Sequence, residues 1–327
     1  MNNKTWLLIV ILGIFTFACD NGMTTTNNPN NDDIIMSSTG ISMTYIPSGT
    51  FTMGSPASEK GRYIYESQRQ VTMSSFYMSI YQVTQLQWIT VMVDNSNGIN
   101  MNPSFFDNTG RKLYITSLIL TTPEPGELQS RRPVESVSWY DALVFCNRLS
   151  VIDGLSPAYR IKGSTNPADW GVVPTDYNST WDAVEIVPGS TGYRLPTEAQ
   201  WEYACRAGTT TAFNDGNDDW EDRPALNHTS WNTHNSDYKT HEVGKKAANA
   251  WGLYDMHGNV YEWCWDWNGD YPNNSQINPT GPSGGTTRIV RGGAWNNNGR
   301  GLRSAVRGGI APFIRFEYIG LRLVRPI

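Results

Sequence analysis

The sequence predicts one α+β domain that is rich in loops and has few regular elements. Three helix starts are visible, at Thr84, Ser138 and Thr197, each a side chain that accepts backbone N–H groups of the following turn. Beyond Gly208, where the third helix should stop, no helical period is visible, and Trp, Tyr, Asn and Gly are scattered among short apolar runs. Because no internal repeat and no second linker interrupts this pattern, we expect a single domain.

The three helices are marked in different ways. Thr84 and Gln87 form a capping box, and the helix that they open should run to about Val93. The third helix opens with a second capping box, at Thr197 and Gln200. In the second helix the apolar residues that recur at helical spacing are expected to face the core: Trp139, Ala142, Leu143, Cys146 and Leu149.

Composition excludes two classes of protein. Apolar residues make up 39% of the 327-residue chain and charged residues 17%, against roughly 25% charged in average globular domains. With 13 tryptophans the chain is able to bury a core, unlike disordered chains, which are poor in aromatic residues. A formal net charge of −5 argues against nucleic acid as a partner, because binding phosphates requires an excess of Lys and Arg.

Charge is unevenly distributed along the chain. From Arg288 to the C-terminus there are eight arginines and one acid, Glu317, a local charge of +7, which leaves −12 on the rest of a chain of net charge −5. A basic tail is compatible with binding to nucleic acid or to a membrane. Since these arginines alternate with Gly, Leu, Val and Ala, we expect most of them to pair instead with carboxylates of the acidic remainder.

The first 19 residues have the pattern of a targeting segment. Lys4 precedes an apolar run, 6–17, that is too short to span a membrane, and Ala18 comes directly before Cys19. This resembles a bacterial lipoprotein signal, which implies lipidation of Cys19; an ordinary secretory signal with an incidental cysteine is the alternative. Residues 20–40 are rich in Asn, Thr, Asp and Pro, as flexible tethers are, which leaves 41–327 as the domain.

Cysteine usage argues against a disulfide framework. If Cys19 carries lipid, the remaining three are Cys146, Cys205 and Cys264, and an odd number leaves at least one free thiol. All three adjoin apolar or aromatic residues, as buried cysteines do. Pairing of Cys205 with Cys264 stays open at this point.

Five motifs in a fixed order carry a family resemblance. They are IPSGTFTMGS at 46–55, RPVESVSWYDA at 132–142, GYRLPTEAQWEYA at 192–204, GLYDMHGNVYEW at 252–263 and VRGGAW at 290–295. In this order they resemble the formylglycine-generating enzyme (sulfatase-modifying factor) family, over about residues 42–325. The resemblance implies a C-type-lectin-like α+β fold with few regular elements, in agreement with the loop-rich pattern.

The resemblance also carries an expectation about activity. Enzymes of this family hold copper with a pair of cysteines shortly after the fifth motif and oxidise a substrate cysteine there, since Cu(I) prefers thiolate ligands. In this chain the corresponding stretch, 296–303, contains Asn, Gly, Arg and Leu but no cysteine. We therefore expect a non-enzymatic protein without a catalytic cofactor.

A structural calcium site is a second implication of the resemblance. The family binds calcium through the turn that here is Gly258–Trp263, and the implied ligands are Asn259, the backbone of Val260, and Glu262. Amide, carbonyl and carboxylate oxygens within four residues suit a hard cation. The alternative is that Asn259 stabilises a turn and Glu262 pairs with an arginine.

The stretch 296–318 is unusual for a structured segment because its residues follow no period. Within its flanks it resembles the variable region of proteins diversified by retroelements, whose Asn-rich template is rewritten at adenines. An AAC codon changed at its first two letters yields Phe, Tyr, Ile, Val, Gly, Arg, Asp and Ser among others, but not Glu, Gln, Lys, Met or Trp. From Asn296 to Tyr318 only Glu317 departs from that rule.

Residues that vary between clones have to be exposed, because substitutions in a core cost about 1–5 kcal/mol. We therefore place a ligand-binding surface within a variable region of about 290–325. Its candidate residues are Asn296, Asn298, Arg300, Gly301, Val306, Gly308, Gly309, Ile310, Phe313, Ile314, Phe316, Glu317 and Tyr318. The alternative is that the aromatic residues among them belong to the core of the last strands.

The sequence thus predicts a non-enzymatic lipoprotein, anchored to the membrane of the cell envelope and displayed at the outer surface. Its partner is expected to be a protein or glycan that differs between clones, bound by a monomer. The alternative is a formylglycine-generating-family enzyme, or an accessory of one, in the cell envelope.

Overall fold

The computed structural model describes residues 34–327, within a compact unit that runs from Asp33 to Ile327; the other unit of the chain is Met1–Asp32. The predicted lipoprotein signal with Cys19, and most of the predicted tether, lie outside the described residues. The folded part begins earlier than residue 41, because Ile34–Met36 forms strand β1, which pairs antiparallel with β2, Ser42–Ile46. No helix among residues 34–327 is long and apolar enough to cross a membrane.

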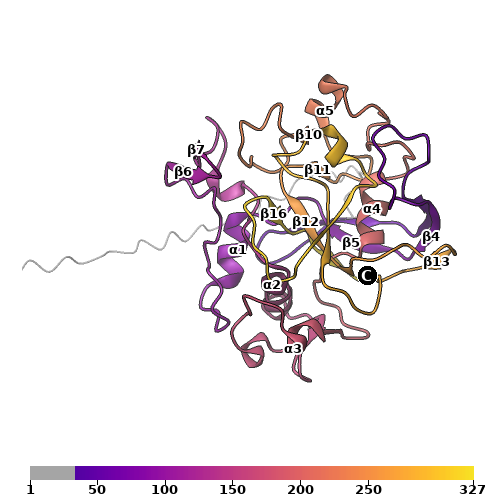
Figure 1. The fold of residues 1–327 in the computed structure, drawn as a ribbon. Helices are drawn as coiled ribbons and strands as arrows, with labels where there is room; N and C mark the ends of the chain where they lie inside the picture. Colours follow the sequence, from indigo (N-terminus) through magenta and orange to yellow (C-terminus); the bar gives the residue numbers. More distant parts are fainter. Residues whose placement is uncertain (1–33) are drawn as a thin grey trace, which may run out of the picture. The chain divides into compact units, whose positions relative to one another are not determined.

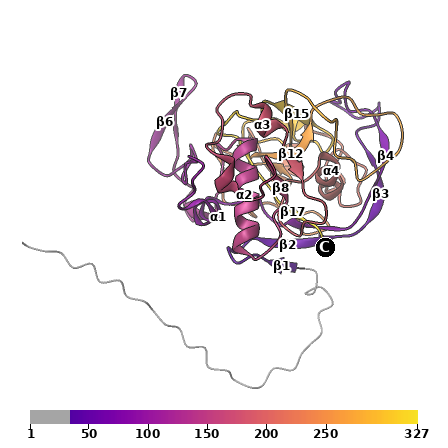
Figure 2. The same cartoon turned by 90° about the horizontal axis from the view of Figure 1, so that it is seen from below.

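The strands form small sheets, as the scattered short apolar runs predict. The first sheet has the order β1-β2-β5-β17, with β5 at Phe76–Ser79 and β17 at Val324–Arg325, so that the C-terminal strand pairs beside the N-terminal ones (Figure 2). The other sheets comprise β3 (Gly49–Met53), β4 (Arg69–Met73) and β13 (Gln276–Ile277); β8 (Tyr159–Arg160) and β9 (Glu185–Ile186); β10 (Ser230–Trp231) and β11 (His257–Gly258); and a hairpin of β6 (Arg111–Tyr114) and β7 (Ser117–Leu120).

A central sheet positions the C-terminal segment. It has the order β15-β14-β12-β16, with bounds Arg307–Ile310, Arg288–Arg291, Tyr261–Trp267 and Ile319–Gly320. Successive side chains of a strand point to opposite faces. Trp263 and Val290 accordingly join the core around helix α2, whereas Cys264 and Ile289 join the core around helix α4. The sheet is therefore buried on both faces.

All three predicted helices are confirmed. Helix α1 spans Gln85–Met92, α2 spans Trp139–Ile152 and α4 spans Glu198–Arg206, and each begins with a capping box, at Thr84, Ser138 and Thr197 respectively (Figure 1). The residues predicted to form the inner face of α2 are all buried. The C-cap of helix α4 is Ala207, which has the left-handed conformation and directly precedes Gly208, the predicted stop.

The expectation of no helix beyond Gly208 is wrong. Helix α5 spans Arg223–Thr229, with Asp222 as its N-cap and a proline in its first turn. It is short and buries only Leu226 and Thr229, so it has no apolar stripe for a period to reveal. A second short helix, α3 at Ser179–Asp182, and three 3-10 turns, Gln129–Arg131, Pro167–Trp170 and Gly299–Leu302, are also missing from the expected elements.

Candidate ligand-binding surface

The candidate variable residues follow the chain from the end of β14 to the start of β16. The segment makes one 3-10 turn, Gly299–Leu302, then strand β15, then a loop that returns to β16. Asn298, Gly309 and Phe316 are exposed. Nine further candidates are half-buried: Asn296, Arg300, Gly301, Gly308, Ile310, Phe313, Ile314, Glu317 and Tyr318. Twelve of the thirteen candidates are thus accessible from solvent.

Val306 is the exception and corrects the predicted set. Its side chain is only 6% exposed, and its carbonyl oxygen accepts a hydrogen bond from the buried guanidinium of Arg291. A residue held in this way belongs to the support of the segment and not to its outer face.

The aromatic candidates are neither fully exposed, as a binding surface would require, nor fully buried, as core residues of the last strands would be. The ring of Phe316 stacks on Tyr318 at 5.0 Å between centroids, and Phe313 meets the edge of Tyr177 at 4.8 Å. Phe313 and Tyr318 also pack against the core around α2. These side chains therefore present one side to solvent and rest on the domain with the other, as aromatic residues at binding surfaces do.

Ion pairs, all of them buried except that of the exposed Arg315, connect this segment to the rest of the domain. Five of the eight C-terminal arginines pair with carboxylates: Arg291 with Glu198 and Glu202, Arg303 with Glu59 and Glu66, Arg307 with Glu198, Arg315 with Asp141, and Arg322 with Glu262. The prediction that most of them pair with acids elsewhere in the chain is confirmed. If one partner of a buried pair is removed, the other is left as an unpaired charge away from water. Substitutions in these buried pairs are therefore expected to destabilise the domain beneath the segment.

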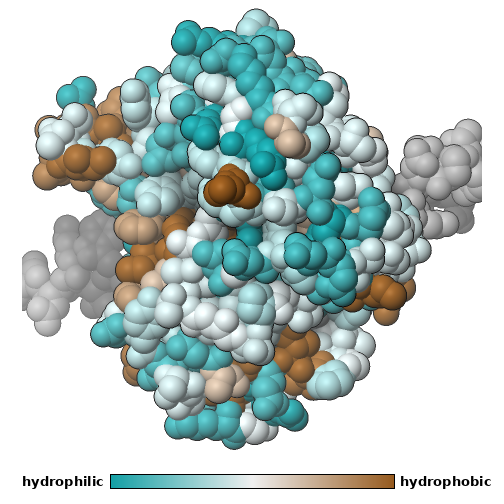
Figure 3. Space-filling model, turned by 45° about the vertical axis from the view of Figure 1, so that its right-hand side comes forward, coloured by the Kyte–Doolittle hydropathy of each residue, from teal (hydrophilic) through white to brown (hydrophobic). Residues whose placement is uncertain are grey.

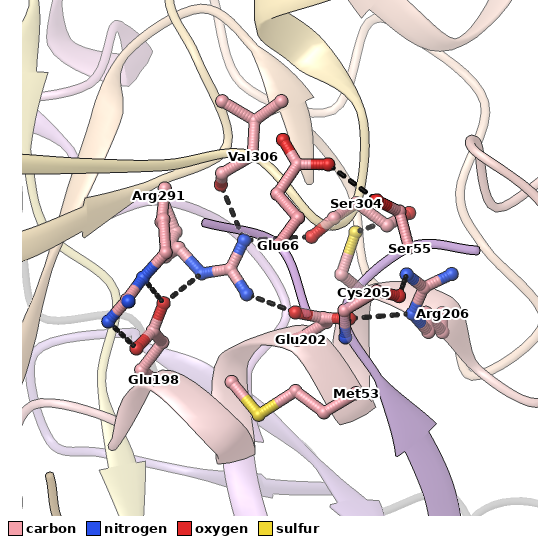
Figure 4. Close-up of polar contacts among 12 residues, drawn as sticks. Met53, Ser55, Glu66, Glu198, Glu202, Cys205, Arg206, Arg291, Ser304 and Val306 are labelled. Carbon is pink, nitrogen blue, oxygen red and sulfur yellow. Dashed lines mark hydrogen bonds and ion pairs between the residues drawn. The ribbon is translucent and has the colours of Figure 1, made fainter. Parts of the chain in front are cut away.

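The network under the segment is centred on Arg291. Figure 4 shows its guanidinium between Glu198 and Glu202 of helix α4, with the carbonyl groups of Ser304 and Val306 above it. Burial raises the pKa of Glu202, but the charges of Arg206 and Arg291 outweigh burial and hold that pKa below its ordinary value. Glu202 therefore stays ionised and paired.

Three tyrosines outside the segment lie beside it, and the sequence analysis did not predict their contacts with it. The guanidinium of Arg300 lies over the ring of Tyr63 at 4.2 Å, and the ring of Tyr65 stacks on Tyr63 at 5.3 Å. The amide of Asn296 donates a hydrogen bond to the hydroxyl of Tyr114, at 3.3 Å. The only signal available was the Tyr-Ile-Tyr triplet at 63–65, which has no period and no motif.

An open depression borders the same surface. It has a volume of about 380 Å³, and its lining includes Tyr65, Asp270, Arg307, Gly308 and Gly309. Gly308 and Gly309 of this lining belong to the candidate set and add no side chain to the depression. The surface is therefore shallow and mixed in polarity, with Tyr, Asn, Gly and Arg prominent among its residues. Tyr, Asn and Gly are also enriched in antibody paratopes, and Arg at their hot spots.

The three cysteines within residues 34–327 are free and buried: Cys146, Cys205 and Cys264. The sulfur of Cys205 lies 3.8 Å from Nε2 of His257, an arrangement that would suit a nucleophile if the groups were charged. Burial instead raises the pKa of Cys205 to about 12 and lowers that of His257 to about 4. Nε2 of His257 also accepts the backbone N–H of Asn214. Both groups are therefore neutral, and neither is exposed to a substrate.

The predicted calcium ligands are only partly suited to the ion. Asn259 does not fit, because its side chain is bonded in both directions to the backbone of His241 and its φ is +63°. Glu262 pairs with Arg322, as the alternative reading expected. Both residues thus make the structural contacts that the alternative expected, and only Glu262 also directs an oxygen, Oε1, at the turn.

The same turn nevertheless gathers oxygen atoms around one point. Nε2 of Gln82 lies within 3.0–3.3 Å of the carbonyl oxygens of Asp255, Gly258 and Val260 and of Oε1 of Glu262. An amide nitrogen has two hydrogens to donate, so it cannot satisfy four acceptors fully. Oε1 of Gln82 and Oδ1 of Asp255 are buried without a partner. A group of acceptors in excess of donors is the chemistry of a site for a hard cation.

Comparison with known proteins bears on the family and the fold. The family model of the sulfatase-modifying factor enzyme 1-like domain matches residues 36–327. Among solved structures, Treponema denticola variable protein 1 is 33% identical and superposes with a TM-score of 0.74, over 88% of this chain and 95% of that one.

Two curated relatives cover most of the chain. The chaperone protein LppX of Paenibacillus barcinonensis is 32% identical over 89% of this chain and 88% of its own length. The formylglycine-generating enzyme of Bos taurus is 26% identical over 77% of this chain and 65% of its own length. The α+β fold expected from the resemblance is confirmed, and the chain belongs to the sulfatase-modifying factor (formylglycine-generating enzyme) family.

Proposed function

We propose that this chain is a non-enzymatic lipoprotein of the cell envelope, displayed at the outer surface, whose C-terminal surface binds ligands. The observation that carries the proposal is the division of the segment 296–318 into two sets of residues. Twelve candidates are accessible, whereas Leu302, Arg303 and Arg307 between them are buried, the two arginines in ion pairs. Surface positions away from special contacts tolerate substitution within about ±0.5 kcal/mol, so such a surface changes without unfolding the domain.

The likeness to a variable protein supports the same proposal. At 33% identity over most of both chains, the two share a fold. We propose a protein or glycan ligand that differs between clones and is bound by a monomer, with no role for nucleic acid. Lipidation of Cys19 would hold the domain at the membrane, and 20–33 would act as the tether.

The alternative, an enzyme of the family, requires an accessible thiol. The three cysteines in 34–327 are buried, and burial raises the pKa of each one, to about 12 in Cys205. The thiolate is the nucleophile and the metal ligand, so these groups are poorly suited to copper-dependent oxidation. This supports the non-enzymatic proposal.

A peptide assay separates the two functions. Residues 34–327, given copper, oxygen and a sulfatase peptide of the form Cys-x-Pro-x-Arg, are expected to yield no formylglycine by mass spectrometry. The bovine formylglycine-generating enzyme, assayed in parallel, controls for the peptide and the copper. Turnover above a copper blank would contradict the proposal, and its loss in Cys205→Ser would identify the thiol responsible.

We also propose that the turn around Gly258 holds a structural calcium ion. Asp255, Gly258, Val260 and Glu262 would supply oxygens, and rotation of the Gln82 amide would add Oε1 in place of Nε2. Calcium here would neutralise a crowded set of acceptors and hold the turn to the loop between β5 and α1. It has no part in ligand chemistry.

Thermal melts test the calcium proposal. A ligand that binds only the folded state stabilises it, by about 2.7 kcal/mol at a hundredfold excess over Kd. We expect residues 34–327 to melt at a higher temperature in calcium than in EDTA, and Gln82→Met to lose that difference. Gln85→Met, which removes another buried amide away from the turn, should keep it. Identical melts of the unmodified domain in calcium and EDTA would contradict the proposal.

A further inference from the structure

The hairpin of β6 and β7 has one face fastened to the domain and one face bare. Its strands pair only with each other among the described strands. Tyr114 and Ile119, on one face, pack against the cluster of Phe106 and Trp295, with the rings of Tyr114 and Trp295 5.4 Å apart. The hairpin is thus held firmly at the border of the C-terminal surface, although two strands alone would be marginally stable.

The opposite face is aliphatic. Cross-strand pairs place Leu113 beside Leu118 and Arg111 beside Leu120 on this face. Leu113 is 65% exposed and Leu118 62%. The hairpin projects from the body of the domain in two perpendicular views (Figure 1 and Figure 2), and apolar residues gather on this projection at the upper left of Figure 3. Contiguous exposed apolar patches mark interaction sites.

The tip of the hairpin adds an independent observation. Ile115 occupies the turn with φ at +54°, and its side chain is 79% exposed. A positive φ is unfavourable for a β-branched residue, and hairpin turns of this kind prefer Asn or Gly. The chain therefore holds an isoleucine at the outermost position at a cost in backbone energy, where a polar residue would be more stable.

The chemistry of this face fits a lipid bilayer better than a protein. Centres of protein interfaces are enriched in Trp, Tyr and Arg, whereas leucine is under-represented among their hot spots. The bare face offers leucines and a terminal isoleucine without an aromatic ring. Residues 111–120 contain no acid, and Arg111 lies on the bare face, whereas Lys112 lies on the fastened face and pairs with Asp107. The charge of Arg111 favours anionic headgroups.

From these observations we infer that the β6–β7 hairpin inserts its tip into a membrane with anionic lipids. Ile115, Leu113 and Leu118 enter the acyl boundary, and Arg111 lies at the headgroups. Because Tyr114 bonds to Asn296, insertion places the C-terminal surface beside the bilayer. The inference stands apart from the proposed function, since the hairpin residues that would enter the membrane include no candidate variable residue and no lipid anchor.

Vesicle sedimentation tests the inference. Residues 34–327 lack the predicted anchor and form a compact unit with its own core, so they are the appropriate sample. They are expected to sediment with vesicles of phosphatidylcholine and phosphatidylglycerol. The double variant Ile115→Asn, Leu118→Ser should bind at least about tenfold more weakly, from the loss of two apolar side chains. Its melting temperature should not fall, because Asn accepts a positive φ.

Ile64→Asn is the matched control. Ile64 is 89% exposed on another loop, so Ile64→Asn removes at least as much exposed apolar surface as Ile115→Asn alone, without touching the hairpin. This variant should sediment like the unmodified domain. The inference is overturned if the unmodified domain stays in the supernatant, if the double variant sediments equally well, or if Ile64→Asn weakens binding as much.

Discussion

Replacing Arg322 with alanine is expected to lower the free energy of unfolding by about 3–5 kcal/mol. The guanidinium is fully buried and donates to both carboxylate oxygens of Glu262, each at 2.9 Å. It also donates to the carbonyl oxygens of Ser79, Ile80 and Tyr254. Alanine would leave a buried carboxylate short of partners and three carbonyl groups without water to replace the lost donor.

Arg325→Ala is the matched control for this prediction. It lies three residues along the same chain end, is only half-buried, and donates one hydrogen bond, to the carbonyl of Thr191. We expect its effect to stay within about 0.5 kcal/mol. Urea denaturation at neutral pH measures both variants. Equal losses in the two would show that the buried pair with Glu262 does not stabilise the domain as argued.

Trp295→Ala should destabilise the domain by a similar amount, about 3–5 kcal/mol, through the cavity that it leaves. The indole is completely buried, and its ring meets the edges of Phe106 and Tyr114, each at 5.4 Å between centroids. Its Nε1 donates to the carbonyl oxygen of Glu317, which ties the start of the segment to its end. Loss of the indole would therefore remove both the packing beneath the segment and the hydrogen bond between its two ends.

Phe316→Ala removes a ring from the same segment and provides the comparison. Phe316 is 37% exposed and stacks on Tyr318. Less of its area is buried, so we expect a loss of about 1 kcal/mol or less. Calorimetric melts of the two variants give the difference directly. A larger loss from Phe316→Ala than from Trp295→Ala would mean that the segment is part of the core and not a surface.

The features that the sequence predicted correctly are those encoded locally. A capping box lies within four residues, so Thr84, Ser138 and Thr197 mark helix starts without knowledge of the fold. Arginines scattered in an apolar context require acids elsewhere, and five of the eight have them. Helix α5 was missed because it is short and buries only Leu226 and Thr229, which leaves no apolar stripe.

The errors in the site arise from contacts between distant parts of the chain. No sequence pattern near Val306 indicates that its carbonyl oxygen accepts a hydrogen bond from Arg291. The contacts of Tyr63 and Tyr114 with the segment join residues about two hundred positions apart. The oxygen cluster at Gly258 likewise involves Gln82, which lies in the loop between β5 and α1, more than 170 positions earlier in the chain. Such neighbours are set by topology, which a single sequence of irregular loops does not reveal.

Sequencing this gene from many individual cells tests the central claim, that the C-terminal surface varies in order to bind. We expect differences to concentrate in the codons of the twelve accessible candidates, with Trp295, Leu302, Arg303, Arg307 and Ile319 unchanged. A near-duplicate of codons 290–325 should lie beside a reverse transcriptase gene. One identical sequence in every cell, with no such copy nearby, or differences spread evenly over buried and accessible codons, would contradict the account.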